Sequence, residues 1–132
     1  MNQLSIKISS KRENVRIAEK FIDDAKKKYK IKDDIYGNIM IAVIESVSNA
    51  IIHGNKQDHN KDVDLELTFN KSAISVLVTD EGKGYDFNNI PDPTLPENIE
   101  KEGGRGVYIM KNLCDKVTFF DKGRKIQLLF NV

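Results

Sequence analysis

The sequence predicts one α+β domain over residues 1–132, a two-layer α/β sandwich whose mixed, mostly antiparallel sheet has helices packed on one face. Five stretches alternate apolar and polar residues, which is the period of strands with one buried face. Three other stretches repeat apolar residues at intervals of three and four, the period of amphipathic helices. The length of 132 residues is enough for one domain to bury its own core.

The composition is that of an ordinary folded, soluble protein. Hydrophobic residues make up 39% of the chain and charged residues 31%. The 21 basic and 20 acidic residues are interleaved and leave a net charge of +1, which does not favour binding to nucleic acid or to an anionic membrane. The N-terminus has no apolar signal segment and no apolar run approaches the length of a membrane span, so we expect a cytoplasmic protein.

Cysteine and histidine are scarce. Cys114, His53 and His59 are too few for a Cys/His zinc site or a disulfide framework, which fits a reducing compartment. Cys114 has helical spacing with its apolar neighbours, so we interpret it as a core residue and not as a nucleophile.

The chain begins with a predicted strand and helix. Residues Gln3 to Ser9 alternate as a strand, and residues 11–30 have the spacing of an amphipathic helix. The basic run Lys26, Lys27 and Lys28 is expected on the solvated face of that helix, with a nucleic-acid patch as the weaker alternative.

Two hairpins are expected to complete the sheet. Residues 63–69 and 73–80 alternate on either side of an Asn-Lys-Ser connection, which predicts an antiparallel pair. At the end of the chain, KVTFF and KIQLLFNV flank DKGR, whose Gly123 suits a tight connection. Residues 82–106 lie between the hairpins and hold all three prolines and five of the eight glycines. A loop of this length is unusual in a compact domain unless it has a function, such as covering a ligand.

A second helix, expected from near Asp33 to His53 with Gly54 ending it, carries the first candidate site residues. Glu45 and Asn49 are four residues apart, so their side chains project from the same helix face. Their oxygen atoms suit Mg²⁺, which is commonly shared with substrate phosphates, and Asn49 could ligate while Glu45 acts as a base. A surface Glu-Asn pair remains the alternative.

The second candidate is the segment DEGKG, which follows a strongly apolar strand. Gly82 and Gly84 would let the backbone approach a ligand, while Asp80 could accept a hydrogen bond from an amino group such as that of adenine. The alternative is a plain turn. Neither a P-loop nor a Rossmann turn is present, because no Gly-Lys-Ser/Thr follows and Phe87 stands where a third glycine would be.

The third candidate is GGRG, which leads into the helical spacing of VYIMKNLC. Gly104 and Gly106 at the start of a helix would expose unpaired N–H groups to phosphate oxygens, and Arg105 could add a charge-assisted contact. A hinge into an ordinary amphipathic helix is the alternative. The order and spacing of the three segments are more specific than any one of them.

These segments resemble the GHKL ATP-binding superfamily of gyrase-type, histidine-kinase and mismatch-repair ATPases. IESVSNAIIHGN is similar to its N box, DEGKG to its G1 box, and GGRGVYIMKNLCDKV to its G2 box and the helix that follows. NAIIHGN, the small size and the PDP-containing loop are most similar to bacterial anti-sigma factor serine/threonine kinases. The likeness covers nearly the whole chain and implies the GHKL ATPase fold.

The resemblance implies ATP and Mg²⁺ as cofactors. It implies that Glu45 is the general base, that Asn49 is the Mg²⁺ ligand and that Asp80 contacts adenine. The glycines of DEGKG, Gly82 and Gly84, would line the base pocket. The residues implied beside the phosphates are Gly104, Arg105 and Gly106.

The implied function is an ATP-dependent protein serine kinase that phosphorylates a STAS-domain anti-sigma-factor antagonist, with a sigma factor as a further partner and a homodimer as a compatible state. The alternative is an ATP-gated protein-binding switch of the same fold that transfers no phosphate. The catalytic piece of a histidine kinase is less favoured, since His53 and His59 do not lie on a dimerisation helix pair.

Overall fold

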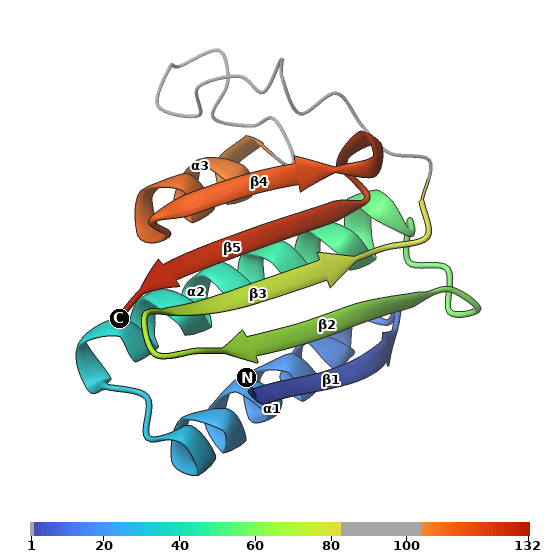
Figure 1. The fold of residues 1–132 in the computed structure, drawn as a ribbon. Coiled ribbons are helices and arrows are strands. Elements are labelled where there is room, and N and C mark those ends of the chain that lie inside the picture. The colour runs from blue at the N-terminus through green and yellow to red at the C-terminus, as the bar shows by residue number, and fades with distance from the viewer. Residues whose placement is uncertain (1, 83–103) are drawn as a thin grey trace.

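The computed structural model describes residues 2–82 and 104–132, with side chains for 2–82 and 108–132. The described chain forms a five-stranded sheet in the order β1-β2-β3-β5-β4, and each neighbouring pair is antiparallel. Helices α1 (Val15–Tyr29), α2 (Asp33–Asn49) and α3 (Gly104–Leu113) cover one face of this sheet (Figure 1). The predicted two-layer sandwich is therefore confirmed. The strands are β1 (Asn2–Ser9), β2 (Asp62–Phe69), β3 (Ala73–Thr79), β4 (Lys116–Phe120) and β5 (Lys125–Asn131).

The helices begin and end close to the positions expected from the sequence. A 3₁₀ turn (Arg12–Asn14) leads into α1 (Val15–Tyr29), which ends where Lys30 takes a left-handed backbone with φ 54°. The second helix, α2 (Asp33–Asn49), continues into a π-helical turn (Ala50–Gly54), which the sequence did not predict. In that turn the Asn55 N–H donates to the Ala50 carbonyl at 2.8 Å.

Both hairpins predicted from the sequence are present. Strands β2 and β3 pair through a turn in which the Asn70 side-chain oxygen accepts hydrogen bonds from the Ser72 and Ala73 N–H groups at 2.9 and 2.8 Å. Between β4 and β5, Gly123 has a φ of 85°, a left-handed conformation that glycine adopts without steric cost. The pairing of β1 with β2 joins strands far apart in sequence, which the strand patterns alone did not indicate.

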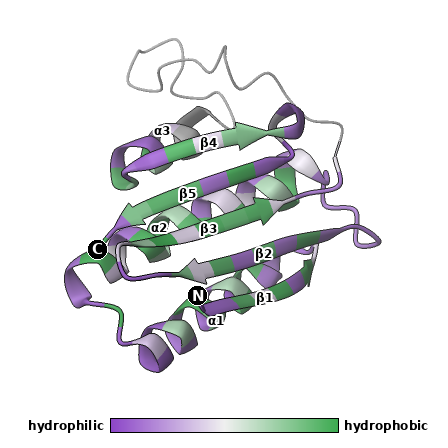
Figure 2. Ribbon diagram, in the orientation of Figure 1, coloured by the Kyte–Doolittle hydropathy of each residue, from purple (hydrophilic) through white to green (hydrophobic). Residues whose placement is uncertain are grey.

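The core lies between the sheet and the helices. Along β2 and β3, alternate residues are buried, and Figure 2 shows the corresponding alternation of hydrophobic and hydrophilic residues. Leu67, Val76 and Leu128 are aligned across three strands and are fully buried. Val43 and Val47 of α2 are fully buried as well. Burial of this kind is the main stabilising contribution to the fold.

One helical segment is long and apolar enough to cross a membrane, by length and composition only, which the sequence reading did not anticipate. This segment is Asp33–Gly54, with a mean hydropathy of 1.5. Its apolar residues Ile39, Val43 and Val47 are fully buried inside the domain. Because those side chains fill the core, we interpret the segment as the central helix of a folded domain.

Candidate functional site

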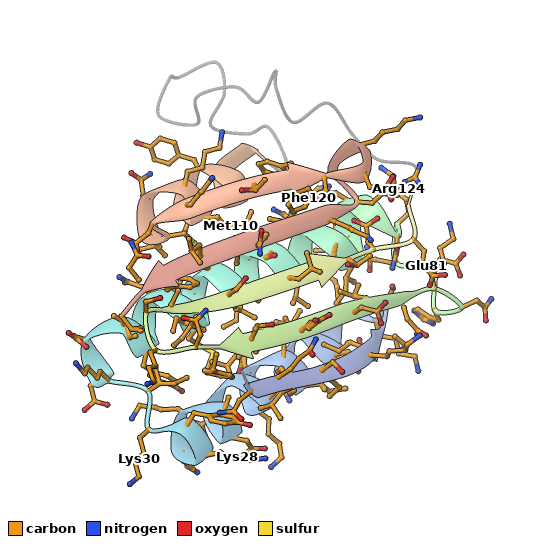
Figure 3. The ribbon with its side chains drawn as sticks, viewed as in Figure 1. Lys28, Lys30, Glu81, Met110, Phe120 and Arg124 are labelled. Atoms are coloured by element: carbon orange, nitrogen blue, oxygen red, sulfur yellow. The ribbon has the colours of Figure 1, made fainter. Side chains whose placement is uncertain are left out.

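The candidate site is built where the end of β3, the end of the α2 helix and the start of β5 meet. Asp80 follows β3 directly, and its N–H donates to the Arg124 carbonyl at 2.9 Å. This bond fixes Asp80 beside the start of β5. Figure 3 labels Glu81 and Arg124 at this end of the molecule.

Asp80 is a buried carboxylate, with 7% of its surface exposed. Its Oδ1 accepts a hydrogen bond from the Gly82 N–H at 2.8 Å. Burial raises the pKa of the Asp80 carboxyl, and the Gly82 hydrogen bond lowers it less strongly. No ion pair found among the described residues includes Asp80, so this carboxylate remains able to accept a hydrogen bond from a ligand.

Two glycines allow the backbone to close around Asp80. A Cβ added to Gly54 would lie 2.4 Å from Asp80 Oδ2, and one added to Gly82 would lie 2.1 Å from the Gly54 carbonyl oxygen. Any side chain at either position would therefore force a shift. Gly82 was expected to let the backbone approach a ligand; here it lies against the Gly54 backbone, and its contact with a ligand stays a prediction. Gly54 was expected only to end a helix, and its contact with Asp80 was missed.

Asn55 ties the site to three other parts of the chain, and sequence reasoning missed it. Its side chain is buried, with 1% exposed, and its Nδ2 donates to Ser10 Oγ at 2.8 Å and to the Asp62 carbonyl at 3.0 Å. Its Oδ1 accepts from the Glu81 N–H at 2.7 Å. The ends of β1 and β2 are thus joined to the segment that carries Asp80. The only sequence signal was an amide residue directly after a helix-ending glycine.

Glu45 and Asn49 lie one turn apart near the end of α2, and both are partly buried. The Asn49 Nδ2 atom is buried and has no hydrogen-bond partner within the described chain. A buried amide without a partner costs about 1–3 kcal/mol, and such a group in a native protein often meets a ligand. The π-helical turn begins at the next residue, and turns of this kind are frequent at functional sites.

The third predicted segment opens α3 (Gly104–Leu113), as expected. Gly104, Arg105 and Gly106 form its first turn, so their backbone N–H groups lack helical acceptors. The Arg105 side chain and Gly84 lie outside the described residues. Met110 of α3 is fully buried and anchors the helix in the core.

The environment of Cys114 supports its interpretation as a structural residue. The thiol is partly buried, and burial raises its pKa to about 12. Because the thiolate is the reactive form, this cysteine is a poor nucleophile at neutral pH.

The site has features that fit a nucleotide and a shared metal ion. The buried Asp80 carboxylate and the close-packed glycines are the observations that fit a nucleotide. At Asn49 the atom that could bind a metal ion is the side-chain oxygen, because the unpartnered Nδ2 is a hydrogen-bond donor suited to an oxygen acceptor such as phosphate. Within the described ranges, no cluster of three or more His, Cys, Asp or Glu side chains could hold a metal alone. A metal ion near Asn49 would therefore take its remaining ligands from water and phosphate oxygens, as Mg²⁺ commonly does.

Comparison with known proteins agrees with the resemblance drawn from the three segments. The chain is 34% identical over 86 residues to the serine-protein kinase RsbW of Bacillus subtilis, an alignment that covers 61% of this chain and 54% of the relative. It is 30% identical over 95 residues to the serine-protein kinase RsbW of Staphylococcus aureus, covering 67% of this chain and 59% of the relative. The matches thus span just over half the length of these relatives.

The fold also matches a solved structure. The RsbU and RsbW domains of a Mycobacterium tuberculosis protein superpose with a TM-score of 0.69 at 13% identity, covering 99% of this chain and 32% of that one. At this identity the likeness concerns the fold alone. The profile of the histidine kinase-like ATPase domain matches residues 8–130. The chain therefore belongs to the histidine kinase-like ATPase domain family, in which its relatives include serine-protein kinases of the RsbW type.

Proposed function

We propose that this protein is an ATP- and Mg²⁺-dependent protein serine kinase of the anti-sigma factor type. Its substrate would be a serine of a STAS-domain anti-sigma-factor antagonist, and it would also sequester a sigma factor. We propose that it acts in the cytoplasm and forms a homodimer. The observation that carries the nucleotide part is the buried Asp80 carboxylate, enclosed by Gly54 and Gly82 at the end of β3. The names of the RsbW relatives support the kinase part.

Each site residue has one task in this proposal. The Asp80 carboxylate accepts a hydrogen bond from the adenine amino group, while Gly82 and Gly84 line the base pocket. Asn49 contributes an amide oxygen to the metal ion, which when bound neutralises charge on the phosphates. The first turn of α3, with Gly104 and Gly106, donates N–H groups to phosphate oxygens.

Glu45 is the proposed general base. It would take the proton from the serine hydroxyl of the partner as that oxygen forms its bond to the γ-phosphorus of ATP, while the bond from this phosphorus to the β–γ bridging oxygen breaks and ADP leaves. Glu45 and Asn49 project from the same face of α2, so the base and the metal ligand lie side by side. Arg105 is proposed to contact phosphate through a charge-assisted hydrogen bond.

The direct test is a phosphoryl-transfer assay. The protein is incubated with γ-labelled ATP, Mg²⁺ and a STAS-domain protein from the same genome, and label on that protein is measured. A partner variant with alanine at the acceptor serine is the control. The kinase assignment is wrong if ATP binds but no label reaches the STAS protein.

The second candidate function is an ATP-gated protein-binding switch of the same fold. Such a protein would capture its partner only with ATP bound and would never phosphorylate it. The carboxylate at Glu45 argues for the kinase, because a switch needs no base. A pull-down in which capture depends on ATP, while mass spectrometry finds the partner unmodified, would favour the switch.

A further inference from the structure

A cavity of about 580 Å³ lies at the end of the molecule away from Asp80, between the α1–α2 connection and the β2–β3 hairpin. Figure 3 labels Lys30, one of its lining residues, at one end of the molecule, and Glu81, the neighbour of Asp80, at another. Nothing in the proposed nucleotide chemistry uses this cavity.

The floor of the cavity is apolar. The rings of Tyr29 and Phe69 are stacked, with centroids 4.3 Å apart and planes 24° apart. Ile31 and Ile74 are 7% and 5% exposed and continue the floor on either side of the rings. Such a surface binds an apolar group by removing it from water.

The rim of the cavity is positively charged. Lys30, Lys32 and Lys71 line it and are exposed, and no lining side chain is acidic. The ion pairs found within the described chain include none of these three lysines. On the neighbouring helix surface, by contrast, Lys26 pairs with Asp33 at 2.7 Å and Lys27 with Asp23 at 3.8 Å.

We propose that this cavity, defined by the Tyr29–Phe69 floor and the rim of Lys30, Lys32 and Lys71, is a binding site for a small amphipathic organic anion. The ligand would have an apolar body of aliphatic or aromatic carbon and a carboxylate head. A volume of about 580 Å³ falls within the range of small-molecule sites. The inference does not rest on the kinase reaction, and the ligand would bind together with ATP.

The experiment uses decanoate as the probe and the whole protein labelled with ¹⁵N. Amide resonances are followed during titration, with ATP and Mg²⁺ present at saturation so that the nucleotide site is filled. We expect decanoate to shift the resonances of Tyr29, Ile31, Phe69 and Lys71. Decyltrimethylammonium, which has the same chain and the opposite charge, should leave them unchanged.

Two double variants separate the rim from general charge effects. Lys30→Asn with Lys71→Gln removes two rim charges, and asparagine tolerates the left-handed backbone at position 30. We expect decanoate affinity to fall roughly five- to tenfold. The matched control, Lys11→Gln with Lys20→Gln, changes two exposed lysines that do not line the cavity and should stay within about twofold.

Four outcomes would overturn the proposal. The first is the absence of shifts at the cavity residues. The second is a decanoate affinity that is much lower with saturating ATP than in a parallel titration without it, which would assign the binding to the nucleotide site. The third is equal binding of the cationic probe, and the fourth is an equal loss of affinity in both double variants, since either result would remove the role of the rim charges.

Discussion

Glu45 offers a test of chemistry separate from binding. Replacing it by alanine removes the proposed base without touching Asp80, so ATP affinity should remain within about twofold while phosphoryl transfer falls roughly 10²–10⁴-fold. Single-turnover transfer to the STAS partner and isothermal titration with ATP measure the two effects. Glu19→Ala on the exposed face of α1 is the matched control. Equal transfer rates in the wild type and Glu45→Ala would remove Glu45 as the base.

Asp80 is expected to improve binding at the expense of stability. Because burial raises the pKa of Asp80, ionising this carboxyl costs more free energy in the folded protein than in the unfolded chain. Asp80→Asn should therefore weaken ATP binding roughly ten- to hundredfold, because an amide replaces the carboxyl proposed to accept the adenine hydrogen bond, without lowering the free energy of unfolding at pH 7. Titration calorimetry and urea denaturation measure the two quantities.

The difference in unfolding free energy between the wild type and Asp80→Asn should depend on pH, in the direction set by the raised pKa of Asp80. Below the pKa of the unfolded chain, Asp80 is protonated in both states and costs nothing. As pH rises through the higher folded pKa, the wild type loses stability and Asp80→Asn does not. A difference that instead shrinks as pH rises would contradict the desolvation of Asp80.

At the scale of elements, Asn55 joins the end of β1 and the start of β2 to the segment that carries Asp80. Asn55→Ala would remove the hydrogen bonds from this side chain to Ser10, Asp62 and Glu81 and should cost at least about 2 kcal/mol of stability. The proposed hydrogen bond from the adenine amino group to Asp80 would make the protein prefer ATP over GTP. Because the Glu81 N–H adjoins Asp80, this preference should also fall in Asn55→Ala. Competition binding with the two nucleotides measures that preference.

Two variants distinguish positioning by Asn55 from stability alone. Asn55→Asp keeps the acceptor for the Glu81 N–H and loses the donors to Ser10 and Asp62, so it should retain more of the ATP preference than Asn55→Ala. Tyr36→Phe removes the hydrogen bond from Tyr36 to Asp23, at the end of α2 away from Asn55, and should lower stability alone. A reduced ATP preference in Tyr36→Phe would show that any loss of stability has this effect.

The π-helical turn places Gly54 against Asp80, and alanine at this position should act mainly on the ligand. The added Cβ would meet the end of the Asp80 side chain, which must then move, so we expect ATP affinity to fall roughly tenfold or more. Gly37→Ala in the same helix meets nothing within 4 Å and should instead raise stability by about 0.5–1 kcal/mol. Binding by titration and stability by denaturation separate the two variants, and unchanged affinity in Gly54→Ala would contradict the contact.

The helices and strands could be predicted largely because their patterns are local. The alternation in β2 and β3 and the spacing in α1 are set by which face of each element is buried. The π-helical turn and the contacts of Gly54 and Asn55 could not be predicted in this way. They depend on where the ends of separate elements meet, which no short stretch of sequence encodes.

At the scale of the whole molecule, a ligand that binds only the folded state should stabilise every element together, because one core joins the sheet to the helices. ATP with Mg²⁺ at one hundred times its dissociation constant should add about 2.7 kcal/mol and raise the melting temperature by roughly 5–12 °C. Removing Mg²⁺ with EDTA should abolish most of the shift if the metal ion is shared between Asn49 and phosphate. Scanning calorimetry measures both, and a shift that EDTA does not alter would contradict the shared metal.

The tie made by Asn55 also has a consequence for the order of folding. The β2–β3 and β4–β5 hairpins connect neighbouring stretches of chain. By contrast, β1 pairs with β2 across a long separation in sequence, with Asn2 opposite Phe69. Long-range pairings form late because loop closure costs entropy before any contact repays it. Asn55 reaches Ser10 only once β1 is in place. We therefore expect the proposed nucleotide site to be completed late in folding, so that a bound nucleotide would act by slowing unfolding and not by speeding folding.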